Sequence, residues 1–350
     1  MPKVLVAMSG GVDSSTTALL LKEQGYECVG ATMRLCTEKL LGKPAESDDV
    51  EDARSVCAKL GIPFVELDCA DEFESTVVRD FVDSYLAGET PNPCIVCNRR
   101  LKFGALYEKA RDLGCDFIAT GHYARILRDG QGRPRLAKAI DPSKDQSYVL
   151  YSLIPEKLEH VLLPLGGMTK AQVRQIAEEH GLVTAHKSES EDICFVPDGS
   201  YLDFLGRYAD VACEPGDIVD VDGRRIGTHK GAIAYTIGQR KGLGIGGLKE
   251  PYFVCGKDMP SNTVVAGPES ALFASELVAR DWNWIAPESE GPFRASVRTR
   301  YHQQEQAAVL TPGPGNRMHV AFDQPQRGIA PGQAVVAYDG DLVVGGGTIC

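Results

Sequence analysis

The sequence predicts an α/β protein whose doubly wound parallel sheet is followed by a small central β domain and a C-terminal β barrel. Three observations lead to this prediction. A short apolar run near the N-terminus passes through a Gly-rich turn into a helix, and strands then alternate with helices over the first 200 residues. From about Tyr201 the helical periods fade, and short β runs bounded by glycines replace them. We therefore expect domains at residues 1–200, 201–270 and 271–350.

The first strand is expected at residues 4–8, because a continuous apolar run with β-branched residues is typical of a strand buried on both faces. Asp13 and Ser14 are expected to cap the helix that follows. The same criteria predict strands at 27–33, 62–67 and 116–120, and helices at 48–60, 72–85, 99–113 and 169–180. In the C-terminal part, strands are expected at 217–221, 224–228, 252–254, 263–266, 294–301, 307–310, 318–322 and 334–338.

The turn after the first strand, SGGVDS at residues 9–14, is called the Gly loop below. A glycine turn between a strand and a helix N-terminus forms an anion pocket, because backbone N–H groups approach the ligand and the helix dipole favours negative charge. No Lys follows the glycines, so the loop differs from GxxxxGK[ST], and its glycine spacing differs from GxGxxG. The alternative is a tight turn without a ligand. The serines and glycines together favour phosphate.

Composition is that of an ordinary globular protein. The chain has 350 residues, a net charge of −11 and 43% hydrophobic residues. No apolar run approaches the roughly 20 residues of a membrane span, and no signal-peptide cleavage region is found. We therefore expect a cytoplasmic protein without a membrane partner. In a reducing compartment, the 11 cysteines are more often buried, catalytic or metal-binding than disulfide-bonded.

One stretch carries the opposite charge to the rest of the chain. Residues 98–138 contain ten basic and four acidic residues, a local net charge of +6. Such a stretch can bind a polyanion such as nucleic acid, or it can be a solvated basic face. Charge alone leaves both interpretations open.

A CxxC pair, Cys94 and Cys97, follows Pro91 and Pro93. The prolines predict an extended loop, and Asn98 is expected to cap the helix at 99–113. Cys97 would then lie beside a helix N-terminus and basic side chains, which lower a thiol pKa and favour a nucleophilic thiolate. The alternative is a buried structural pair. A lone CxxC is weak evidence for zinc, which prefers four ligands.

Other single residues are less informative on their own. Cys194 lies in a short apolar run and resembles an ordinary buried cysteine. His122 follows a strand end, where a lone histidine is usually structural. Met33 is expected at the carboxyl end of a strand, where it contacts either an adenine or the core.

Six motifs occur in one order and carry a family resemblance. SGGVDS resembles the PP-loop of the N-type ATP pyrophosphatases, which cut ATP between its α and β phosphates. With it, the set resembles the MnmA family of tRNA 2-thiouridylases over essentially the whole chain. The remaining motifs are TPNPCIVCNRRLKFG at 90–104, ATGHYAR at 119–125, KDQSYVLY at 144–151, SEDICFV at 190–196 and HKGAIAYTIGQRKGLG at 229–244.

The resemblance implies ATP- and Mg²⁺-dependent sulfuration of the wobble uridine in tRNAs for Lys, Glu and Gln. It implies that Cys194 carries a persulfide received from a cysteine desulfurase or a sulfur-relay protein, and that Cys97 is the partner nucleophile that forms a disulfide with it. Asp13 is expected to take part in catalysis. ATP would bind to Ala7, Met8, Ser9, Gly10, Gly11, Val12, Asp13, Ser14, Met33 and Gly121, and tRNA to His122, Lys144, Asp145, Gln146, Arg300, Tyr301 and Gln333.

Cys94 departs from the family pattern, in which an Asp is common. Three thiolates, from Cys94, Cys97 and Cys194, could hold a [4Fe–4S] cluster with one open iron, and Cys194 would then be a ligand. We favour the persulfide route, because a three-Cys cluster lacks the usual fourth ligand. A different PP-loop ATP-dependent ligase is the other alternative, but it has no use for these cysteines.

Overall fold

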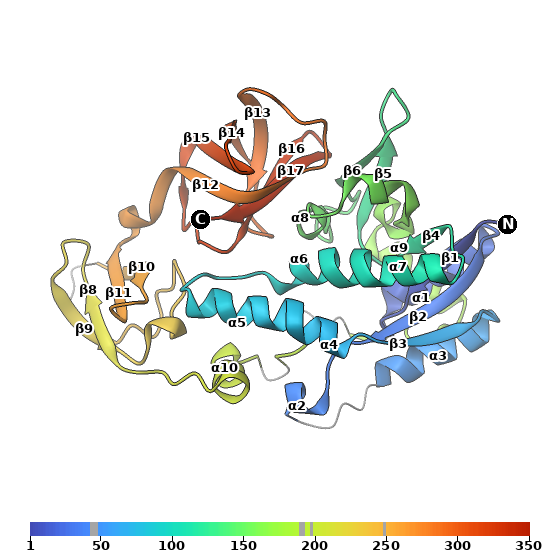
Figure 1. Cartoon of the computed structure of the whole chain (residues 1–350), viewed down its shortest axis with the longest axis horizontal. Coiled ribbons are helices and arrows are strands. Elements are labelled where there is room, and N and C mark those ends of the chain that lie inside the picture. The colour runs from blue at the N-terminus through green and yellow to red at the C-terminus, as the bar shows by residue number, and fades with distance from the viewer. Residues whose placement is uncertain (43–47, 189–192, 197–198, 248–249) are drawn as a thin grey trace.

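The computed structural model describes residues 1–42, 48–188, 193–196, 199–247 and 250–350. Three parts follow one another along the long axis of the molecule (Figure 1). An α/β layer structure with the N-terminus occupies one end, and a small β sheet occupies the other end. The C-terminal barrel lies between them, above the long helices that run along the axis. This arrangement confirms the predicted fold class.

The α/β part is built on a parallel sheet of five strands in the order β3-β2-β1-β4-β7. The chain starts in the middle strand and later returns to its other side, so the strand order reverses between β1 and β4. Ligands of such sheets bind in the crevice at this reversal, beyond the carboxyl ends of the strands. The strands are β1 (Lys3–Ala7), β2 (Glu27–Arg34), β3 (Phe64–Asp68), β4 (Phe117–Ala119) and β7 (Val161–Leu162).

Helices cover both faces of this sheet. Val4 and Val6 of β1 pack in a core with α1 (Val12–Glu23), α3 (Asp48–Leu60) and α9 (Lys170–Glu179). Leu5, which points to the other face, packs with α7 (Leu106–Asp112). The predicted helices at 48–60 and 169–180 are confirmed within a residue at each end. The helical segment predicted at 72–85 is observed as α4 (Ala70–Phe73), η1 (Glu74–Val78) and α5 (Arg79–Leu86).

Two expected helix starts are wrong. Helix α1 begins at Val12 with Gly11 as its N-cap, so Asp13 and Ser14 lie inside its first turn. The helix expected from residue 99 begins at Pro93, whose missing N–H costs nothing at the first helical position. Asn92 caps it by accepting a bond from Cys94 N at 3.2 Å. The elements of this helix are α6 (Pro93–Cys97), η2 (Asn98–Ala105) and α7 (Leu106–Asp112).

A hairpin that the sequence analysis did not predict joins the α/β part to the barrel. It consists of β5 (Ala124–Arg128) and β6 (Pro134–Lys138), and Ala137 of β6 pairs with Leu342 of the barrel. Both strands therefore extend the C-terminal sheet although they lie in the N-terminal half of the chain. Arg125 of this hairpin also donates to Asp341 at 2.7 Å.

The barrel closes because β12 (Phe273–Trp284) pairs with both β15 (Arg317–Arg327) and β17 (Leu342–Ile349). Neither β12 nor β17 was predicted. In β17 three successive glycines hide the strand pattern, and Gly346 is required there because a Cβ would lie 2.6 Å from the ring of Tyr151. The other barrel strands are β13 (Phe293–Arg298), β14 (Gln306–Gly313) and β16 (Ala334–Asp339).

The central part is a four-stranded sheet in the order β10-β11-β8-β9. All four strands were expected, although β10 continues to Asp258. A core of its own, including Ile218, Val254 and Val264, fills this sheet. The strands are β8 (Gly216–Val219), β9 (Arg225–His229), β10 (Tyr252–Asp258) and β11 (Thr263–Pro268).

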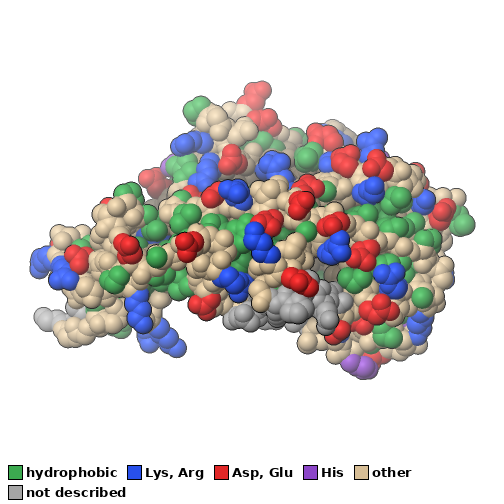
Figure 2. Space-filling model, turned by 60° about the horizontal axis from the view of Figure 1, so that its bottom comes forward, with side chains coloured by type: hydrophobic (Ala, Val, Ile, Leu, Met, Phe, Trp, Pro, Cys, Tyr) green, Lys and Arg blue, Asp and Glu red, His purple; other side chains and the backbone are tan. Residues whose placement is uncertain are grey.

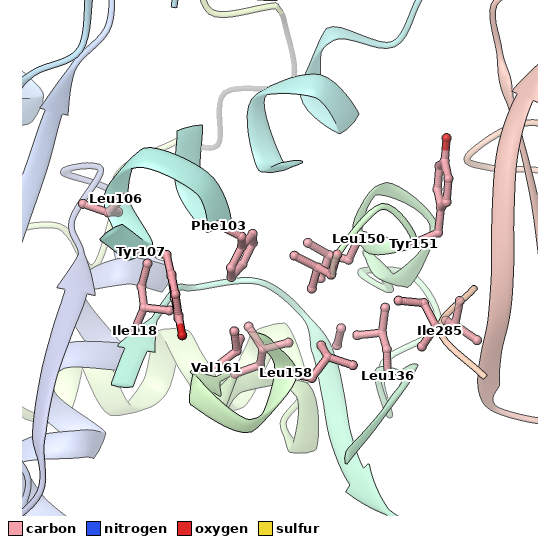
Figure 3. Packing of buried hydrophobic residues seen from close by; sticks show 14 of the residues in the cluster. Phe103, Leu106, Tyr107, Ile118, Leu136, Leu150, Tyr151, Leu158, Val161 and Ile285 are labelled. Carbon is pink, nitrogen blue, oxygen red and sulfur yellow. The ribbon is translucent and has the colours of Figure 1, made fainter. Parts of the chain in front are cut away.

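One continuous core connects the parallel sheet to the barrel. Figure 3 shows Ile118 and Tyr107 of the α/β part at one side of this core and Ile285 of the barrel region at the other. Tyr148 of α8 (Ser147–Leu150) belongs to the same core, and its hydroxyl donates to Ala334 O at 2.8 Å. The site at the sheet edge is therefore held in place against the barrel. No helix among the described residues is long and apolar enough to cross a bilayer.

Candidate functional site

The Gly loop follows the first strand, as predicted, and it lies where the strand order of the sheet reverses. Ser9 N donates to Ser14 Oγ at 3.1 Å, and Ser14 Oγ donates to Gly11 O at 3.1 Å, so the loop folds back on the start of α1. Gly10 has φ of +71°, and a Cβ there would lie 2.3 Å from Asp49 O. Only glycine fits this position. The turn and the helix N-terminus therefore provide the backbone donors of an anion site.

Asp13 is held from two sides. Lys170 Nζ lies 2.7 Å and 2.8 Å from its two carboxylate oxygens, and the Tyr123 hydroxyl donates to it at 2.7 Å. Gly121 packs against the same turn, because a Cβ there would lie 2.9 Å from Asp13 C and Ser14 N. The sequence analysis did not identify Lys170, whose only local signal is its place after the helix cap Thr169.

A cavity of about 810 Å³ opens beside the Gly loop and is called the central cavity here. Its walls come from the carboxyl ends of β1, β2 and β4, from η2 and from the segment that carries Cys194. Met33 lines it, as expected for a residue at a strand end. The residues that line the central cavity include Ala7, Met8, Ser9, Asp13, Ser14, Met33, Cys36, Lys102, Gly121, His122, Gln146 and Cys194.

Two thiols meet in the wall of the central cavity. Cys36 and Cys194 both line it, and their side chains hydrogen-bond to each other. This bond to Cys36 holds the pKa of the Cys194 thiol well above its ordinary value, although the residue is exposed. The same bond lowers the pKa of Cys36. Cys36 was not singled out in the sequence, although it lies just past the end of a parallel strand.

Cys97 does not have the lowered pKa that the sequence predicted. It lies inside the helix that starts at Pro93, and it is 9% exposed among apolar side chains. Burial raises its pKa to about 11, and the nearby charge of Lys102 opposes this more weakly. Because the helix begins earlier than expected, the favourable N-terminal position is lost.

Among the described residues, Cys94 does not belong to a group of metal-binding side chains. Burial raises the pKa of its thiol, and Lys102 again opposes the shift. Within residues 1–42, 48–188, 193–196, 199–247 and 250–350, no three His, Cys, Asp or Glu side chains are grouped as metal ligands. The described geometry therefore gives no support to the cluster formed by Cys94, Cys97 and Cys194.

Comparison with known proteins adds to this geometry. Three family models match successive parts of the chain: a tRNA methyl transferase HUP domain at residues 2–198, a tRNA methyl transferase PRC-barrel domain at 202–268 and an aminomethyltransferase beta-barrel domain at 274–349. The tRNA-specific 2-thiouridylase MnmA of Moorella thermoacetica is 52% identical over 352 residues, which cover 99% of this chain and 98% of that protein. The chain belongs to the MnmA family of tRNA-specific 2-thiouridylases. The resemblance seen in the motifs is thereby confirmed.

A second MnmA relative, from Acetivibrio thermocellus, is 48% identical and covers 99% of both chains. Among solved structures, a 4-thiouridine synthetase–RNA complex with bound ATP matches with a TM-score of 0.37 and 18% identity. That match covers 60% of this chain and 51% of the other. Membership of the MnmA family makes this chain one of the PP-loop enzymes that use ATP.

Some of the residues expected to bind tRNA in this MnmA family member line the central cavity, and others lie elsewhere. His122 and Gln146 line the central cavity. His122 is 7% exposed, and its Nδ1 lies 2.7 Å from Thr120 Oγ1. Burial, together with the charge of Lys102, holds the pKa of His122 well below its ordinary value of 6.5. The ring is therefore neutral at pH 7.

Asp145 belongs to the packing of the protein. Its side chain is 6% exposed and accepts bonds from Ala139 N at 3.1 Å, Ser147 N at 3.1 Å and Arg298 at 3.1 Å. It therefore fixes the neighbouring Lys144 and Gln146 to the barrel. A direct contact between Asp145 and tRNA would require these bonds to open.

The C-terminal residues connect different parts of the molecule. Arg300 donates to Gly328 O at 2.7 Å and to Ile237 O at 3.3 Å, so it links the barrel to the central part. The ring of Tyr301 lies 6.0 Å from that of Tyr148. Gln333 donates to Thr90 O at 2.7 Å, just before the segment that leads to Cys94.

The basic stretch at 98–138 is largely paired with carboxylates. Six of its ten basic residues form ion pairs with carboxylates of the described part of the chain, namely Lys109, Arg125, Arg128, Arg133, Arg135 and Lys138. Acidic and basic side chains are also interspersed on the face drawn in Figure 2. These pairs favour the solvated-face interpretation for most of the stretch.

Part of the motif at 190–196 (residues 190–192) lies outside the described residues.

Proposed function

We propose that this chain catalyses the ATP-dependent 2-thiolation of the wobble uridine in tRNAs of the Lys, Glu and Gln types. One observation carries the proposal: the Gly loop and the thiol of Cys194 line the same cavity. A phosphate site and a sulfur nucleophile in one cavity suit adenylation followed by sulfur transfer. The names of the MnmA relatives support the same activity.

In this proposal ATP occupies the central cavity with its phosphates on the Gly loop. Backbone N–H groups of residues 9–14 stabilise the charge on the phosphates. Met33 and Gly121 lie beside the nucleotide. Asp13 acts through Lys170 and Tyr123, which hold the turn in place.

Mg²⁺ suits this cavity in ligand type, because the carboxylates of Asp13, Asp49 and Glu66 line it and Mg²⁺ prefers oxygen donors. When bound, it would neutralise charge on the phosphates of ATP.

The sulfur chemistry follows from the poor leaving ability of the uridine C2 oxygen. Adenylation makes AMP the leaving group, and pyrophosphate departs. The terminal sulfur of a Cys194 persulfide then attacks C2 and displaces AMP. A thiol, assigned to Cys97, attacks Cys194 Sγ, so the S–S bond breaks, C2 keeps its sulfur and a Cys97–Cys194 disulfide forms. Because Cys97 is buried, this step requires the two segments to shift toward each other.

The expected partners are tRNA and a sulfur donor of the cysteine desulfurase or sulfur-relay class. A single-stranded anticodon loop can splay out its base and insert it into the central cavity, beside His122. We place the reaction in the cytoplasm, where tRNA is modified and thiols are kept reduced. The persulfide route is preferred over a [4Fe–4S] cluster, because the described cysteines do not form a three-ligand group.

A single anaerobic reaction tests the proposal. Unmodified tRNA-Glu transcript, ATP, Mg²⁺ and a sulfane-sulfur donor (a cysteine desulfurase with cysteine) are incubated with iron-analysed protein, and digested nucleosides are weighed by mass spectrometry. We expect uridine to exchange one oxygen for one sulfur, with AMP formed in step. AMP without thiouridine, in protein that the desulfurase has loaded with persulfide sulfur, would contradict the cysteine assignment. Iron and sulfide bound in proportion to activity would support the cluster instead.

A further inference from the structure

Cys36 is a third thiol of the sulfur-transfer site. It lies just beyond β2, lines the central cavity and hydrogen-bonds to Cys194. Cys194 is fixed there by its neighbour Phe195, which is fully enclosed and whose ring packs 5.1 Å from that of Phe81. Cys36 packs against the same apolar cluster as Phe195, so the backbone beside each of the two thiols is anchored.

Cys97 occupies a different environment. It packs in the apolar cluster of Phe81, Leu101 and Phe195, and it does not line the central cavity. A disulfide between Cys97 and Cys194 would have one sulfur in this apolar cluster. A disulfide between Cys36 and Cys194 would have both sulfurs in the cavity wall, which opens to solvent. Only the second bond lies where an external reductant has access to both sulfurs.

We propose that Cys36 regenerates the enzyme by attacking the Cys97–Cys194 disulfide at Cys194 Sγ. The inference rests on the proposed function, which supplies that disulfide. A Cys36–Cys194 bond forms, the Cys97–Cys194 bond breaks, and the electron pair of the broken bond leaves on Cys97 as a thiolate. The exchange moves no net electrons, so it needs no oxidant. A dithiol reductant then delivers two electrons to the Cys36–Cys194 bond and releases both thiols.

Lys102 favours the exchange. It lines the central cavity, and its positive charge acts on Cys94, Cys97 and Cys194. A nearby cation stabilises the thiolate that leaves Cys97 and also the one released later from Cys194. Cys69 serves as a matched control, because it packs against the same apolar cluster but does not line the cavity.

A single-turnover experiment tests the inference. Reduced enzyme is loaded with one equivalent of persulfide sulfur, mixed with tRNA transcript and ATP without reductant, and quenched with N-ethylmaleimide in acid. Peptide mapping should find mainly a Cys36–Cys194 disulfide in the wild type and in Cys69→Ser. In Cys36→Ser it should find Cys97–Cys194. With a thioredoxin-class dithiol present, later turnovers of Cys36→Ser should be about tenfold slower, while the first turnover persists.

The outcomes separate the inference from the proposed function. Thiouridine formed with only a Cys97–Cys194 disulfide in the wild type would overturn the role of Cys36 and leave the proposed function standing. If no thiouridine forms in the first turnover, both the role of Cys36 and the proposed function are contradicted. A second measurement does not depend on turnover: oxidation of Cys97→Ser by diamide should link Cys36 to Cys194, and the absence of that link in folded protein would overturn the inference.

Discussion

Lys170 Nζ lies 2.7 Å and 2.8 Å from the two carboxylate oxygens of Asp13, so helix α9 is fixed to the first turn of α1. Lys170 is only 9% exposed, so the loss of either partner would leave a charge that water solvates poorly. The contact sets the position of the Gly loop. The loop itself contains no lysine, so the cation beside it comes from α9, far away in the sequence.

Replacing Lys170 by methionine should weaken both ATP binding and stability. The change leaves the Asp13 carboxylate without its cation beside the phosphates, so we expect the KM for ATP to rise about tenfold and the free energy of unfolding to fall by about 1–3 kcal/mol. Urea unfolding and AMP-release kinetics measure these effects. Lys109→Met, which removes an exposed pair with Asp112, is the control and should change stability by less than about 0.5 kcal/mol. Equal behaviour of the two variants would contradict the role of Lys170.

Serine at Cys97 or at Cys194 should separate adenylation from sulfur transfer. Each variant keeps the Gly loop, so it should still release AMP and pyrophosphate when tRNA is added, but it should form no thiouridine. Nucleoside mass spectrometry and pyrophosphate release measure the two steps on one sample. Cys213→Ser, at an exposed cysteine, is the control. Normal thiolation by either variant would refute the cysteine assignment.

His122 should make the protein less stable in mild acid. Its pKa in the folded protein lies well below 6.5 because the ring is buried, whereas the unfolded chain protonates near 6.5. The unfolded state therefore binds more protons, and the stabilisation present above pH 6.5 is lost as the pH falls through this value, with a slope of up to about 1.4 kcal/mol per pH unit. Urea unfolding between pH 5 and pH 8 measures this loss.

Two variants isolate the contribution of His122 to this pH dependence. His122→Gln should have a flatter pH profile than the wild type, while His186→Gln should keep the original one, because the side chain of His186 is 86% exposed. A profile that His122→Gln leaves unchanged would contradict the argument.

Gly346→Ala should destabilise the barrel by overpacking. A Cβ at this position would lie 2.6 Å from the ring of Tyr151 and 2.7 Å from Val335 O, and neither neighbour is the end of a flexible chain. We expect a loss of about 1–3 kcal/mol in urea unfolding. Gly313→Ala in β14 is the matched control, because its nearest contact would be at an ordinary 3.7 Å. If Gly346→Ala lowers the free energy of unfolding no more than Gly313→Ala does, Tyr151 and β17 can move apart without loss of stability, and the overpacking argument is wrong.

The Gly loop, strands β1 to β4 of the parallel sheet and the amphipathic helix α3 could all be predicted, because their signals lie within a few adjacent residues; the two-residue strand β7 was too short to leave such a signal. The start of α6 could not be predicted, because Pro93 is compatible both with a loop and with the first turn of a helix. Only the structure shows that Asn92 is the N-cap, which makes Pro93 the first helical residue. Strand β17 was hidden for a related reason. Its glycines lower the local β propensity, and only tertiary contacts explain their presence: a Cβ at Gly346 would meet Tyr151, and a Cβ at Gly345 or Gly347 would meet the backbone of β12.

The sequence by itself determined the α/β class, the β-rich C-terminal parts and the family, since periodicity and contiguous motifs record short-range backbone preferences. The tertiary structure alone decided that Lys170 holds Asp13, that Cys36 contacts Cys194 and that Cys97 is buried with a raised pKa. These contacts join residues far apart in the chain. Their geometry depends on how helices and sheets pack, and the pKa of a thiol depends on the burial and charge that this packing creates.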